Sequence, residues 1–495
     1  MKSNIKIILI LSIVYSFYSC EDDFLEKEPS EFFTQEQITE AGETDPGVIE
    51  ALMRGIYALM IQTDTGGSNG ADDDFGQKGY DIYGDMLSGD MALSVSTFGW
   101  YRADITEFQA TQDFTRGRNR FAWRYYYRLI RSANATIAAL NLADINAIPE
   151  DETVKSILGQ ARAIRAHSYF YLTQFYANDY NPSAEILPLY DDINDLNGPK
   201  VTTSLIYDLI ERDLRSAIEI LPDSNNKSTI NKNVAKGILA YVLGSKRDSW
   251  GEVATLTKEV IDSGQYTLMS REEITGGFND LNTPGWMWGA DLTIELGLDL
   301  VSWWGQMDSF SFSYAWAGDF KAIDQDLFDA IPEDDARKEQ FRDDVITNRP
   351  LLPLNKFYDP GRVIGGQRNI ITDYVYMRVA EMYLLNAEAL AKSGAEPGAR
   401  TILKQLLDQR LPDSSYVDGL AGNALIDEIY LQTRIELWGE GKSYLAMKRN
   451  QATIKRGANH LSNVGVEIPY NDERLTFEIP ELEIQNNPFI STQND

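Results

Sequence analysis

Aromatic side chains gather in one stretch of the chain, and their chemistry suggests ligand recognition. A sugar ring presents C–H bonds on one face and hydroxyls at its rim, so a flat aromatic ring can stack against it. Covering about 100 Å² of such a face would contribute roughly 2.5 kcal/mol before polar costs. Five of the nine tryptophans lie between residues 286 and 316: Trp286, Trp288, Trp303, Trp304 and Trp316.

The spacing of these aromatics bears on which of them face a ligand. Trp303 and Trp304 are neighbours, and neighbours in an extended chain point in opposite directions, so we expect one of the two to contact ligand. Trp286 and Trp316 are further candidates. Four rings alternate with small residues, so a strand would place them on one face, with core packing favoured for the first two: Phe310, Phe312, Tyr314 and Trp316.

Residues for metal binding or nucleophilic catalysis are sparse. The two histidines, His167 and His460, lie far apart and have no zinc-ligand spacing. One cysteine excludes an intramolecular disulfide. The Asp-rich stretch 64–74 lacks the alternating ligands and terminal Glu of an EF-hand, so we expect no metal and no cofactor. Among 75 acidic residues a glycosidase-like carboxylate pair could exist, which leaves a secreted glycan hydrolase as an alternative.

Length and charge restrict the class of protein further. With 495 residues, of which 43% are hydrophobic, the chain can bury a large core. Its net charge is −30, and phosphate binding needs clustered Lys and Arg. We therefore exclude nucleic acid and an anionic bilayer as the main surface partner.

The first twenty residues have the organisation of an export signal. Lys2 and Lys6 precede an apolar run, residues 7–14, that is too short to span a bilayer comfortably. The segment ends at Cys20, which resembles the lipid acceptor of a bacterial lipoprotein. We expect residues 1–19 to be a signal peptide and Cys20 to carry lipid. An ordinary signal peptide with an incidental cysteine is the alternative.

The rest of the chain is predominantly helical in its pattern. Apolar residues recur at helical spacing, and several segments end at Gly or before Pro. Three stretches between the helices, 63–89, 279–318 and 331–367, are rich in Gly, Asp, Pro or Trp and are expected to be long loops with short strands. The predicted helices are 121–140, 154–176, 204–221, 233–246, 250–263, 372–393, 397–409 and 424–438.

These helices are expected to pack as antiparallel pairs, with small residues such as Ala387, Ala389 and Ala391 on packing faces. The pattern resembles tetratricopeptide stacking without its strict consensus. The predicted fold class is therefore mostly α, a tetratricopeptide-like helical-repeat scaffold with long loop-rich elaborations and a few short strands. Residues 20–270 and 271–495 are expected to form one intertwined globular unit.

Several segments, in order, resemble the SusD/RagB family of outer-membrane lipoproteins. After Cys20 come Asp23-Phe24-Leu25 and Pro29, as at the mature N-terminus of that family. The resemblance spans essentially all of residues 20–488. Its further segments are 161–166 (ARAIRA), 207–222, 235–250, 378–389 (RVAEMYLLNAEA), 434–441 (RIELWGEG), and 477–480 (FEIP) with Glu483 and Asn487-Pro488.

The resemblance implies a function that composition cannot supply. Members of the family are lipid-anchored, extracellular, glycan-binding partners of a TonB-dependent transporter barrel, on which they sit as a lid, and they are not enzymes. Glu21-Asp22-Asp23 resembles the acidic export tags of surface-exposed lipoproteins, with a solvated linker as the alternative. We therefore expect nutrient uptake at the cell outer membrane with a SusC-like partner. A peptide-binding lid of the same transporter type remains an alternative.

The family resemblance implies particular ligand-contact residues, and each of them also has a simpler interpretation as a packing residue. Family members use an aromatic from the N-terminal region, which implies Trp100 or Tyr101 here, with Arg102 and Asp90 as polar contacts. A loop aromatic docked on the scaffold is the alternative. For the charged motif residues and a tyrosine run we favour buried packing and ion pairs over ligand contact: Arg378, Glu381, Glu388, Arg434, Glu436, Tyr125, Tyr126 and Tyr127.

Overall fold

The computed structural model describes residues 35–142, 146–309, 311, 313–341, 350–363 and 368–494. The predicted signal peptide, Cys20, residues 21–23, Phe310 and Phe312 lie outside the described residues, as does the side chain of Trp316. Helices dominate the described part of the chain, so the predicted mostly α fold class is confirmed.

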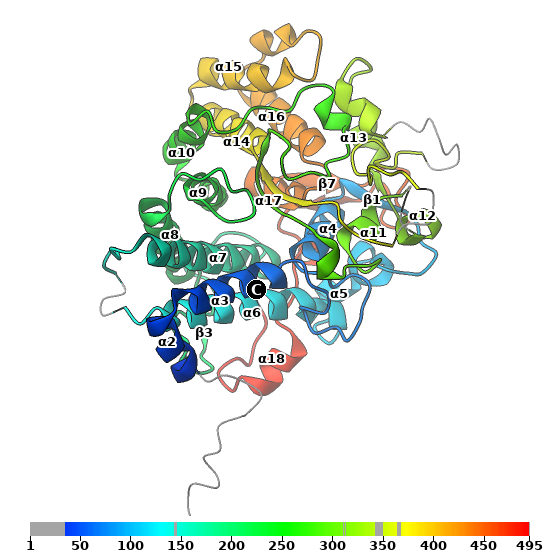
Figure 1. The fold of residues 1–495 in the computed structure, drawn as a ribbon. Helices are drawn as coiled ribbons and strands as arrows, with labels where there is room; N and C mark the ends of the chain where they lie inside the picture. Colours follow the sequence, from blue (N-terminus) through cyan, green and yellow to red (C-terminus); the bar gives the residue numbers. More distant parts are fainter. Residues whose placement is uncertain are drawn as a thin grey trace, which may run out of the picture.

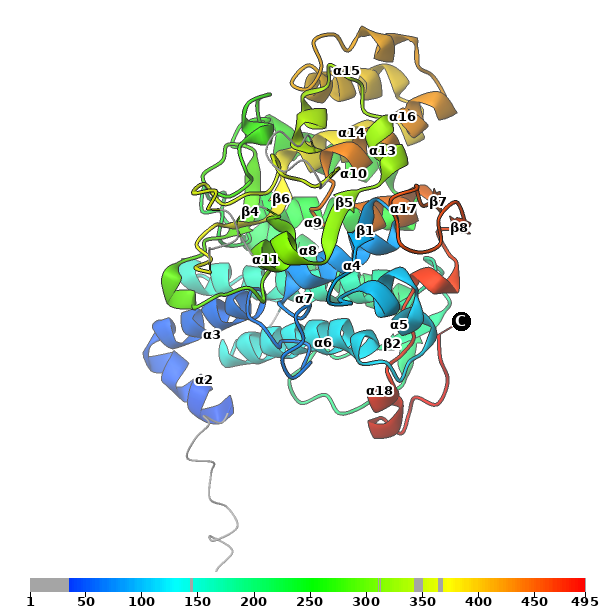
Figure 2. The same cartoon turned by 90° about the vertical axis from the view of Figure 1, so that its right-hand side faces the viewer.

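Long helices form a stack that runs through the molecule (Figures 1 and 2). Helices α6 to α10 each pack on the next in sequence, and α10 then packs on α14, which also contacts α15 and α16. This nearest-neighbour order is consistent with the predicted repeat-like stacking. The stack consists of α2 (Gln35–Thr44), α3 (Pro46–Leu59), α6 (Gly117–Ala139), α7 (Glu152–Tyr176), α8 (Thr203–Ile220), α9 (Lys232–Lys246), α10 (Trp250–Asp262), α14 (Val379–Lys392), α15 (Glu396–Leu407) and α16 (Asn423–Glu436).

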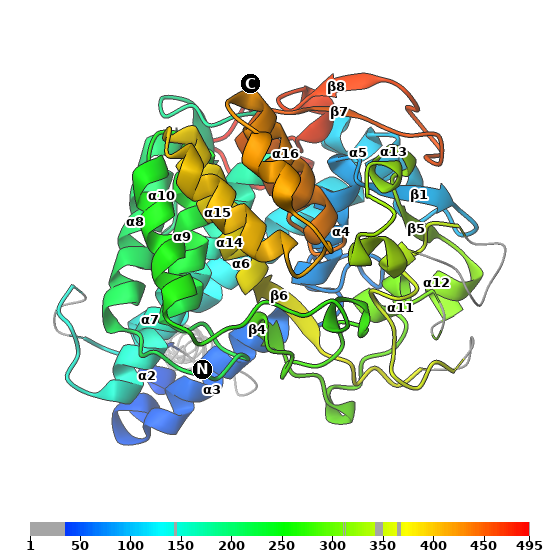
Figure 3. The same cartoon turned by 90° about the horizontal axis from the view of Figure 1, so that it is seen from above.

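Shorter elements cover one side of this stack (Figure 3). They include α4 (Gln77–Leu87), α5 (Gln109–Gln112), α11 (Trp303–Met307), α12 (Ser313–Ala317) and α13 (Gln325–Asp329). Helix α17 (Ser443–Asn450) contacts α16 and α4, and α18 (Glu481–Asn486) lies below α6 (Figure 1). The described strands form antiparallel pairs: β1 (Met91–Val95) with β5 (Phe320–Ile323), β2 (Glu185–Pro188) with β3 (Lys200–Thr202), β4 (Trp286–Ala290) with β6 (Tyr374–Arg378), and β7 (Thr453–Lys455) with β8 (Glu467–Pro469).

Most predicted helices are confirmed to within a few residues, but three predictions are wrong. Residues 374–378 form strand β6, because they pair with β4, and the helix expected from 372 starts only at Val379. The stretch 63–89, expected to be a loop, contains the fully buried helix α4. The strand expected over 310–316 is wrong for residues 313–316, which belong to helix α12.

Buried ion pairs connect several elements of the C-terminal half. Arg378 and Glu436, for which we predicted buried ion pairing, are among them. The Glu436 carboxylate accepts hydrogen bonds from Arg410 at 2.8 and 2.9 Å and from Arg378 at 3.2 Å. Arg337 adds a contact at 3.3 Å, and all four side chains are at most 3% exposed. Burial alone would raise the pKa of Glu436, but Arg410 and then Arg378 and Arg337 outweigh it and hold this pKa well below its usual range.

Arg434 and Trp438, which flank Glu436 in the sequence, hold the start of strand β1 in place. Arg434 donates to the Asp90 carboxylate at 2.6 and 2.8 Å, and the Trp438 indole N–H donates to the Asp90 carbonyl at 2.8 Å. Asp90 is 1% exposed, so it is a structural ion-pair partner and not the ligand contact that we predicted. The scaffold role expected for Arg434 is confirmed.

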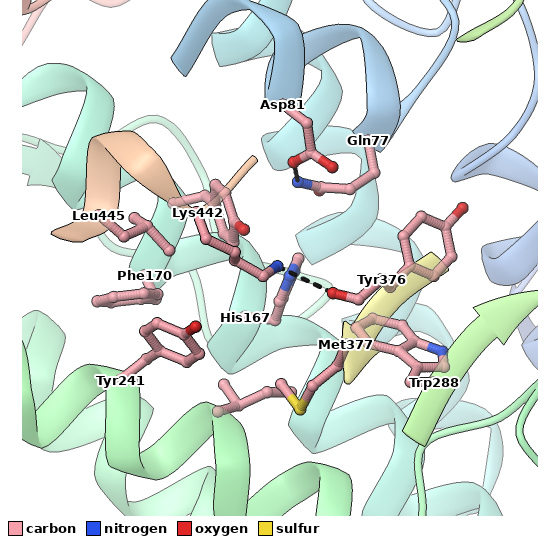
Figure 4. A pocket seen from close by; sticks show the side chains of 12 residues that line it. Gln77, Asp81, His167, Phe170, Tyr241, Trp288, Tyr376, Met377, Lys442 and Leu445 are labelled. Atoms are coloured by element: carbon pink, nitrogen blue, oxygen red, sulfur yellow. Dashed lines mark hydrogen bonds between the residues drawn. The ribbon is translucent and has the colours of Figure 1, made fainter. Parts of the chain in front are cut away.

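A small enclosed cavity lies between α4, α7, α9 and the β4–β6 pair (Figure 4). Lys442 donates to the Tyr376 carbonyl at 2.9 Å across one end, and Gln77 donates to Asp81 at 2.9 Å at another. His167 faces this space, and within the described chain its Nδ1 has no hydrogen-bond partner. With about 20 Å³ open to a water molecule, the cavity has room for about one water and none for a sugar.

We predict that Glu436→Gln lowers the free energy of unfolding by about 3–5 kcal/mol, because it leaves three buried guanidinium groups without their shared carboxylate. Urea unfolding followed by circular dichroism measures this. The matched control is Glu252→Gln, which breaks an ion pair with Arg215 whose side chains are 40% and 46% exposed. That control should cost at most about 1 kcal/mol, and equal losses in the two variants would contradict the prediction.

We also predict that His167 makes the protein sensitive to acid. Burial, with a smaller contribution from Lys442, lowers the pKa of His167 to about 3 from its model-peptide value of 6.5. The unfolded chain therefore takes up a proton first, and stability that is present above pH 6.5 falls as the pH drops towards 3.

Chemical denaturation of the wild type and of His167→Phe at a series of pH values measures this contribution. The wild type should lose about 2.5 kcal/mol more than the variant between neutral pH and about two pH units below the ordinary histidine pKa. Parallel pH profiles for the two proteins would show that His167 does not titrate as proposed.

Candidate functional site

Two segments far apart in the sequence meet where β1 pairs with β5 (Figure 2). The pairing is antiparallel, so the chain that leaves β1 lies beside the chain that enters β5. The register shifts between Leu93 and Val95, and such an irregularity re-aims the residues that follow it. Segment 96–102 is thereby brought next to segment 313–319.

Asp319 fixes the first of these segments with both carboxylate oxygens. They accept the backbone N–H groups of Phe98 and Trp100, each at 3.3 Å, while Asp319 itself is fully buried. Gly99 lies between the two donors with φ of +85°, a conformation that favours glycine. Thr97 adds a hydrogen bond from its hydroxyl to the Gly318 carbonyl at 3.3 Å. These hydrogen bonds therefore fix the turn that carries Phe98 and Trp100.

Three aromatic rings form a continuous surface at this junction, which we call the aromatic patch: Phe98, Trp100 and Tyr314. Phe98 and Trp100 are stacked, with centroids 4.7 Å apart and planes 27° apart. Trp100 contacts Tyr314 at 4.6 Å. Phe98 is 51% exposed, and the other two rings are half-buried. Rings arranged in this way leave an apolar surface open for stacking.

Charged groups lie near Tyr314 of the aromatic patch. Burial and then the neighbouring Asp72 carboxylate raise the pKa of Tyr314, so its hydroxyl stays protonated. Asp299 and Arg368 form a largely exposed ion pair whose charges also act on Tyr314. Arg102 is exposed and pairs with Glu107 at 3.0 Å. An apolar face beside such donors and acceptors is suited to a ligand rich in hydroxyl groups.

Tyr101 does not belong to the aromatic patch, although it was a candidate. Its φ of +63° turns the chain, and its side chain is only 1% exposed. The ring packs edge-on against Tyr83 at 5.9 Å, with the Lys321 ammonium 4.8 Å from its centre. The prediction that Tyr101 contacts ligand is corrected: it is a core residue beneath the turn.

Trp286, Trp303 and Trp304 are also corrected to core positions, because none is more than 1% exposed. Trp286 lies in β4, which is covered by its pairing with β6. Trp303 and Trp304 lie in helix α11 and not in extended chain, so both can be buried, contrary to our argument from alternating directions. The Trp304 indole donates to the Thr372 carbonyl at 2.6 Å.

The aromatic patch thus combines one predicted ligand contact, Trp100, with Phe98 and Tyr314, which were not predicted to contact ligand. Tyr314 belongs to the run of alternating aromatics but is not among the predicted ligand contacts, and Trp316 follows it in α12. Asp319 and Asp72 carried no recognisable signal, since isolated acidic residues are common in this chain. Arg102 remains an exposed neighbour of the patch.

Neither metal binding nor membrane crossing is indicated by the described residues. Within the described ranges, no group of three or more His, Cys, Asp or Glu side chains could hold a metal ion. In the predicted Asp-rich loop, Asp74 instead accepts the Gly66 N–H at 2.9 Å and the Tyr80 hydroxyl at 3.0 Å. None of the helices searched in this part of the chain has the length and apolar character to span a bilayer.

Two family models match the chain, and together they cover about two thirds of it. A SusD-like family, described as starch-binding and associating with the outer membrane, matches residues 77–243. The SusD family matches residues 340–494. Trp100 lies within the first match and Tyr314 lies between the two.

Curated relatives agree with these matches. A SusD-like protein of Bacteroides ovatus is 24% identical over 257 residues, which are 52% of this chain but only 41% of that protein. The alignment therefore spans less than half the length of that relative. The SusD-like protein P2 of Formosa agariphila is 23% identical over 417 residues, 74% of this chain and 78% of that protein.

Solved structures share the fold over nearly the whole chain. A SusD-like carbohydrate binding protein from Bacteroides vulgatus superposes with a TM-score of 0.75 at 23% identity, over 90% of this chain and 97% of that one. A SusD superfamily protein from Bacteroides thetaiotaomicron gives a TM-score of 0.74 at 22% identity, over 90% and 99%.

Proposed function

Because the chain belongs to the SusD family, we propose that it binds carbohydrate on the aromatic patch. The observation that carries this proposal is the stacked Phe98–Trp100 pair with Tyr314 beside it, partly exposed and held by the buried Asp319. A turn that is already ordered loses little conformational entropy on binding, which favours affinity. The family description and the chemistry of the patch point to the same class of ligand.

The protein is proposed to be a binder and not an enzyme. Stacking on the three rings and hydrogen bonds from the surrounding charged groups can hold a sugar without breaking a bond. Arg102 and Arg368 are paired with Glu107 and Asp299, so the patch offers polar groups without an unpaired charge among these four. A neutral glycan is therefore the favoured ligand, and its affinity should depend little on salt.

The wider role that we propose is nutrient uptake at the cell surface. The mature chain would be anchored by lipid at Cys20, would face the extracellular side of the outer membrane, and would act with a SusC-like TonB-dependent barrel as its lid. The family description of outer-membrane association and the lipoprotein-like N-terminus support this role. A peptide-binding lid is the competing function, and a charged peptide would bind with strong salt dependence.

Trp100→Ala should weaken glycan binding roughly fiftyfold, because about 2.5 kcal/mol of stacking is removed. Titration calorimetry with a neutral oligosaccharide selected on a glycan array measures the affinity, and thermal melting of the same samples measures stability. Trp100 is half-buried, so the fold should persist.

Two tryptophans serve as controls for this experiment. Trp250→Ala removes another half-buried indole, at the start of α10, and should leave affinity unchanged. Trp304→Ala should lower stability by about 3–5 kcal/mol, because that ring is fully buried. Unchanged glycan affinity in both Trp100→Ala and Tyr314→Ala would move the site elsewhere.

Cys20→Ala should release the mature protein from membranes into the soluble fraction, because Cys20 is the only cysteine available for lipid attachment. Cell fractionation with immunoblotting measures the distribution, and labelling with a fatty acid probe reports lipid on the wild type. The variant changes only the first residue of the mature chain, so its melting temperature should stay close to that of the wild type. Retention of the variant in the membrane fraction would argue against the anchor.

A further inference from the structure

A buried lysine lies beneath the aromatic patch. Lys321 belongs to β5, which contacts α11 and pairs with β1, where the uncharged Leu93 lies opposite it (Figure 2). Lys321 is only 1% exposed, and its ammonium donates to the Gln306 side-chain oxygen and lies 4.8 Å from the centre of the Tyr101 ring. An ammonium has three N–H donors, so one acceptor and one ring face leave its charged form poorly solvated. Among the residues that the structure describes, no carboxylate forms an ion pair with Lys321.

Two carboxylates act on Lys321 from a longer distance, and they differ in their partners. Asp73, which precedes α4, accepts the Tyr83 hydroxyl at 2.9 Å and two hydrogen bonds from Arg118 at 2.5 and 3.1 Å. Asp319 instead accepts backbone N–H groups from the turn of the aromatic patch, and within the described ranges it forms no ion pair. Lys321 therefore supplies positive charge to a buried carboxylate that has no ion-pair partner of its own.

Burial makes the charge of Lys321 sensitive to pH. It lowers the pKa of Lys321 to about 7, and the opposing contributions of Asp319 and then Asp73 offset it only in part. The amine therefore gains and loses its proton near neutrality, where an ordinary lysine stays charged. The positive charge near Asp319 is thus present in slightly acidic solution and is lost in slightly alkaline solution.

Lys321 is connected to both sides of the aromatic patch. On one side, Asp319 holds the turn of the patch through its two backbone hydrogen bonds. On the other side, Gln306 accepts from Lys321 and donates from its amide to the Asp72 carbonyl at 3.0 Å. The Asp72 carboxylate in turn acts on the Tyr314 hydroxyl. A change of charge at this one buried amine therefore reaches both segments that carry the aromatic rings.

We propose that Lys321 is a positioning residue of the aromatic patch, and that its proton determines how firmly Asp319 holds the turn that carries Phe98 and Trp100. With the proton, the ammonium compensates the buried carboxylate, and the turn keeps the conformation that presents the two rings. Without the proton, Asp319 is a buried anion that lacks this compensating charge, so the turn is held less firmly. A ligand on the patch therefore binds better to the protonated form, and its affinity falls as the pH rises through neutrality. This regulation rests on the proposed function, because the aromatic patch is the site that it controls.

The first test needs no ligand and follows Trp100 directly. The mature chain is labelled with fluorotryptophan, and the Trp100 signal in the fluorine NMR spectrum is identified by its loss in Trp100→Phe. In the wild type this signal should shift with pH, with a midpoint at the pKa of Lys321, about 7. Lys321→Met replaces the amine by an apolar side chain of similar length and should abolish the shift.

Lys448→Met is the matched control for this titration. Lys448 is also buried, and burial lowers its pKa to about 7, but it lies in α17 and donates to the Gln174 and Ala177 carbonyls. Its replacement should leave the titration of Trp100 unchanged. Asp319→Asn is an independent variant, because it removes a charge that raises the pKa of Lys321 and should move the midpoint to lower pH.

The second test measures how protonation is coupled to binding. Titration calorimetry with the neutral oligosaccharide from the glycan array is run at slightly acidic and slightly alkaline pH, in buffers of different ionisation enthalpy. The wild type should take up protons on binding and should bind about fivefold more weakly at the alkaline pH, which is a modest coupling between two linked sites. Both effects should be absent from Lys321→Met and retained in Lys448→Met.

The outcomes separate this proposal from the proposed function. A Trp100 signal that does not shift with pH in the wild type, or that shifts equally in Lys321→Met, would overturn the proposal, and so would equal glycan affinity at both pH values. Should Lys321→Met fail to fold, an unmoved midpoint in Asp319→Asn would have the same meaning. If no glycan binds at all, the proposed function fails, and the fluorine signals still decide whether Lys321 positions the turn.

Discussion

The Glu436 carboxylate lies where four segments of the chain meet inside the protein, and the arrangement of the C-terminal half depends on it. Arg337, Arg378 and Arg410 come from separate elements and converge on this one group. A buried guanidinium needs a partner, and Arg410 finds its carboxylate in Glu436, while Arg378 also pairs with Glu440 and Arg337 with Asp335. The elements that carry these arginines are therefore held together by one connected group of buried ion pairs.

Two sequence neighbours of Glu436 connect this cluster of ion pairs to the candidate site. Arg434 and Trp438 both bind Asp90, which immediately precedes β1, and β1 then pairs with β5. That pairing brings Asp319 under the turn that carries Phe98 and Trp100. A buried ionic cluster and an exposed aromatic surface are therefore linked by a short series of hydrogen bonds, although their chemistry is unrelated.

Buried charges also order a loop beside helix α6. There the buried Arg165–Asp213 pair lies in the segment 161–166 and at residue 213, and Arg165 also donates to the Asp191 carbonyl at 2.8 Å. In both places a buried ion pair fixes the backbone of a segment that lies at the surface.

The sequence by itself determined the helices and the scaffold role of the charged motifs, because helical periodicity is local and charges placed among apolar residues must pair when buried. Through the family resemblance it also offered Trp100 or Tyr101 as an aromatic ligand contact. Only the tertiary structure decided which aromatics are exposed. Trp303 and Trp304 are buried because a short helix replaces the expected extended chain, and strand β6 forms only because β4 is beside it. Trp100 and Tyr314 meet through the pairing of β1 with β5, a contact between residues more than two hundred positions apart that no local pattern encodes.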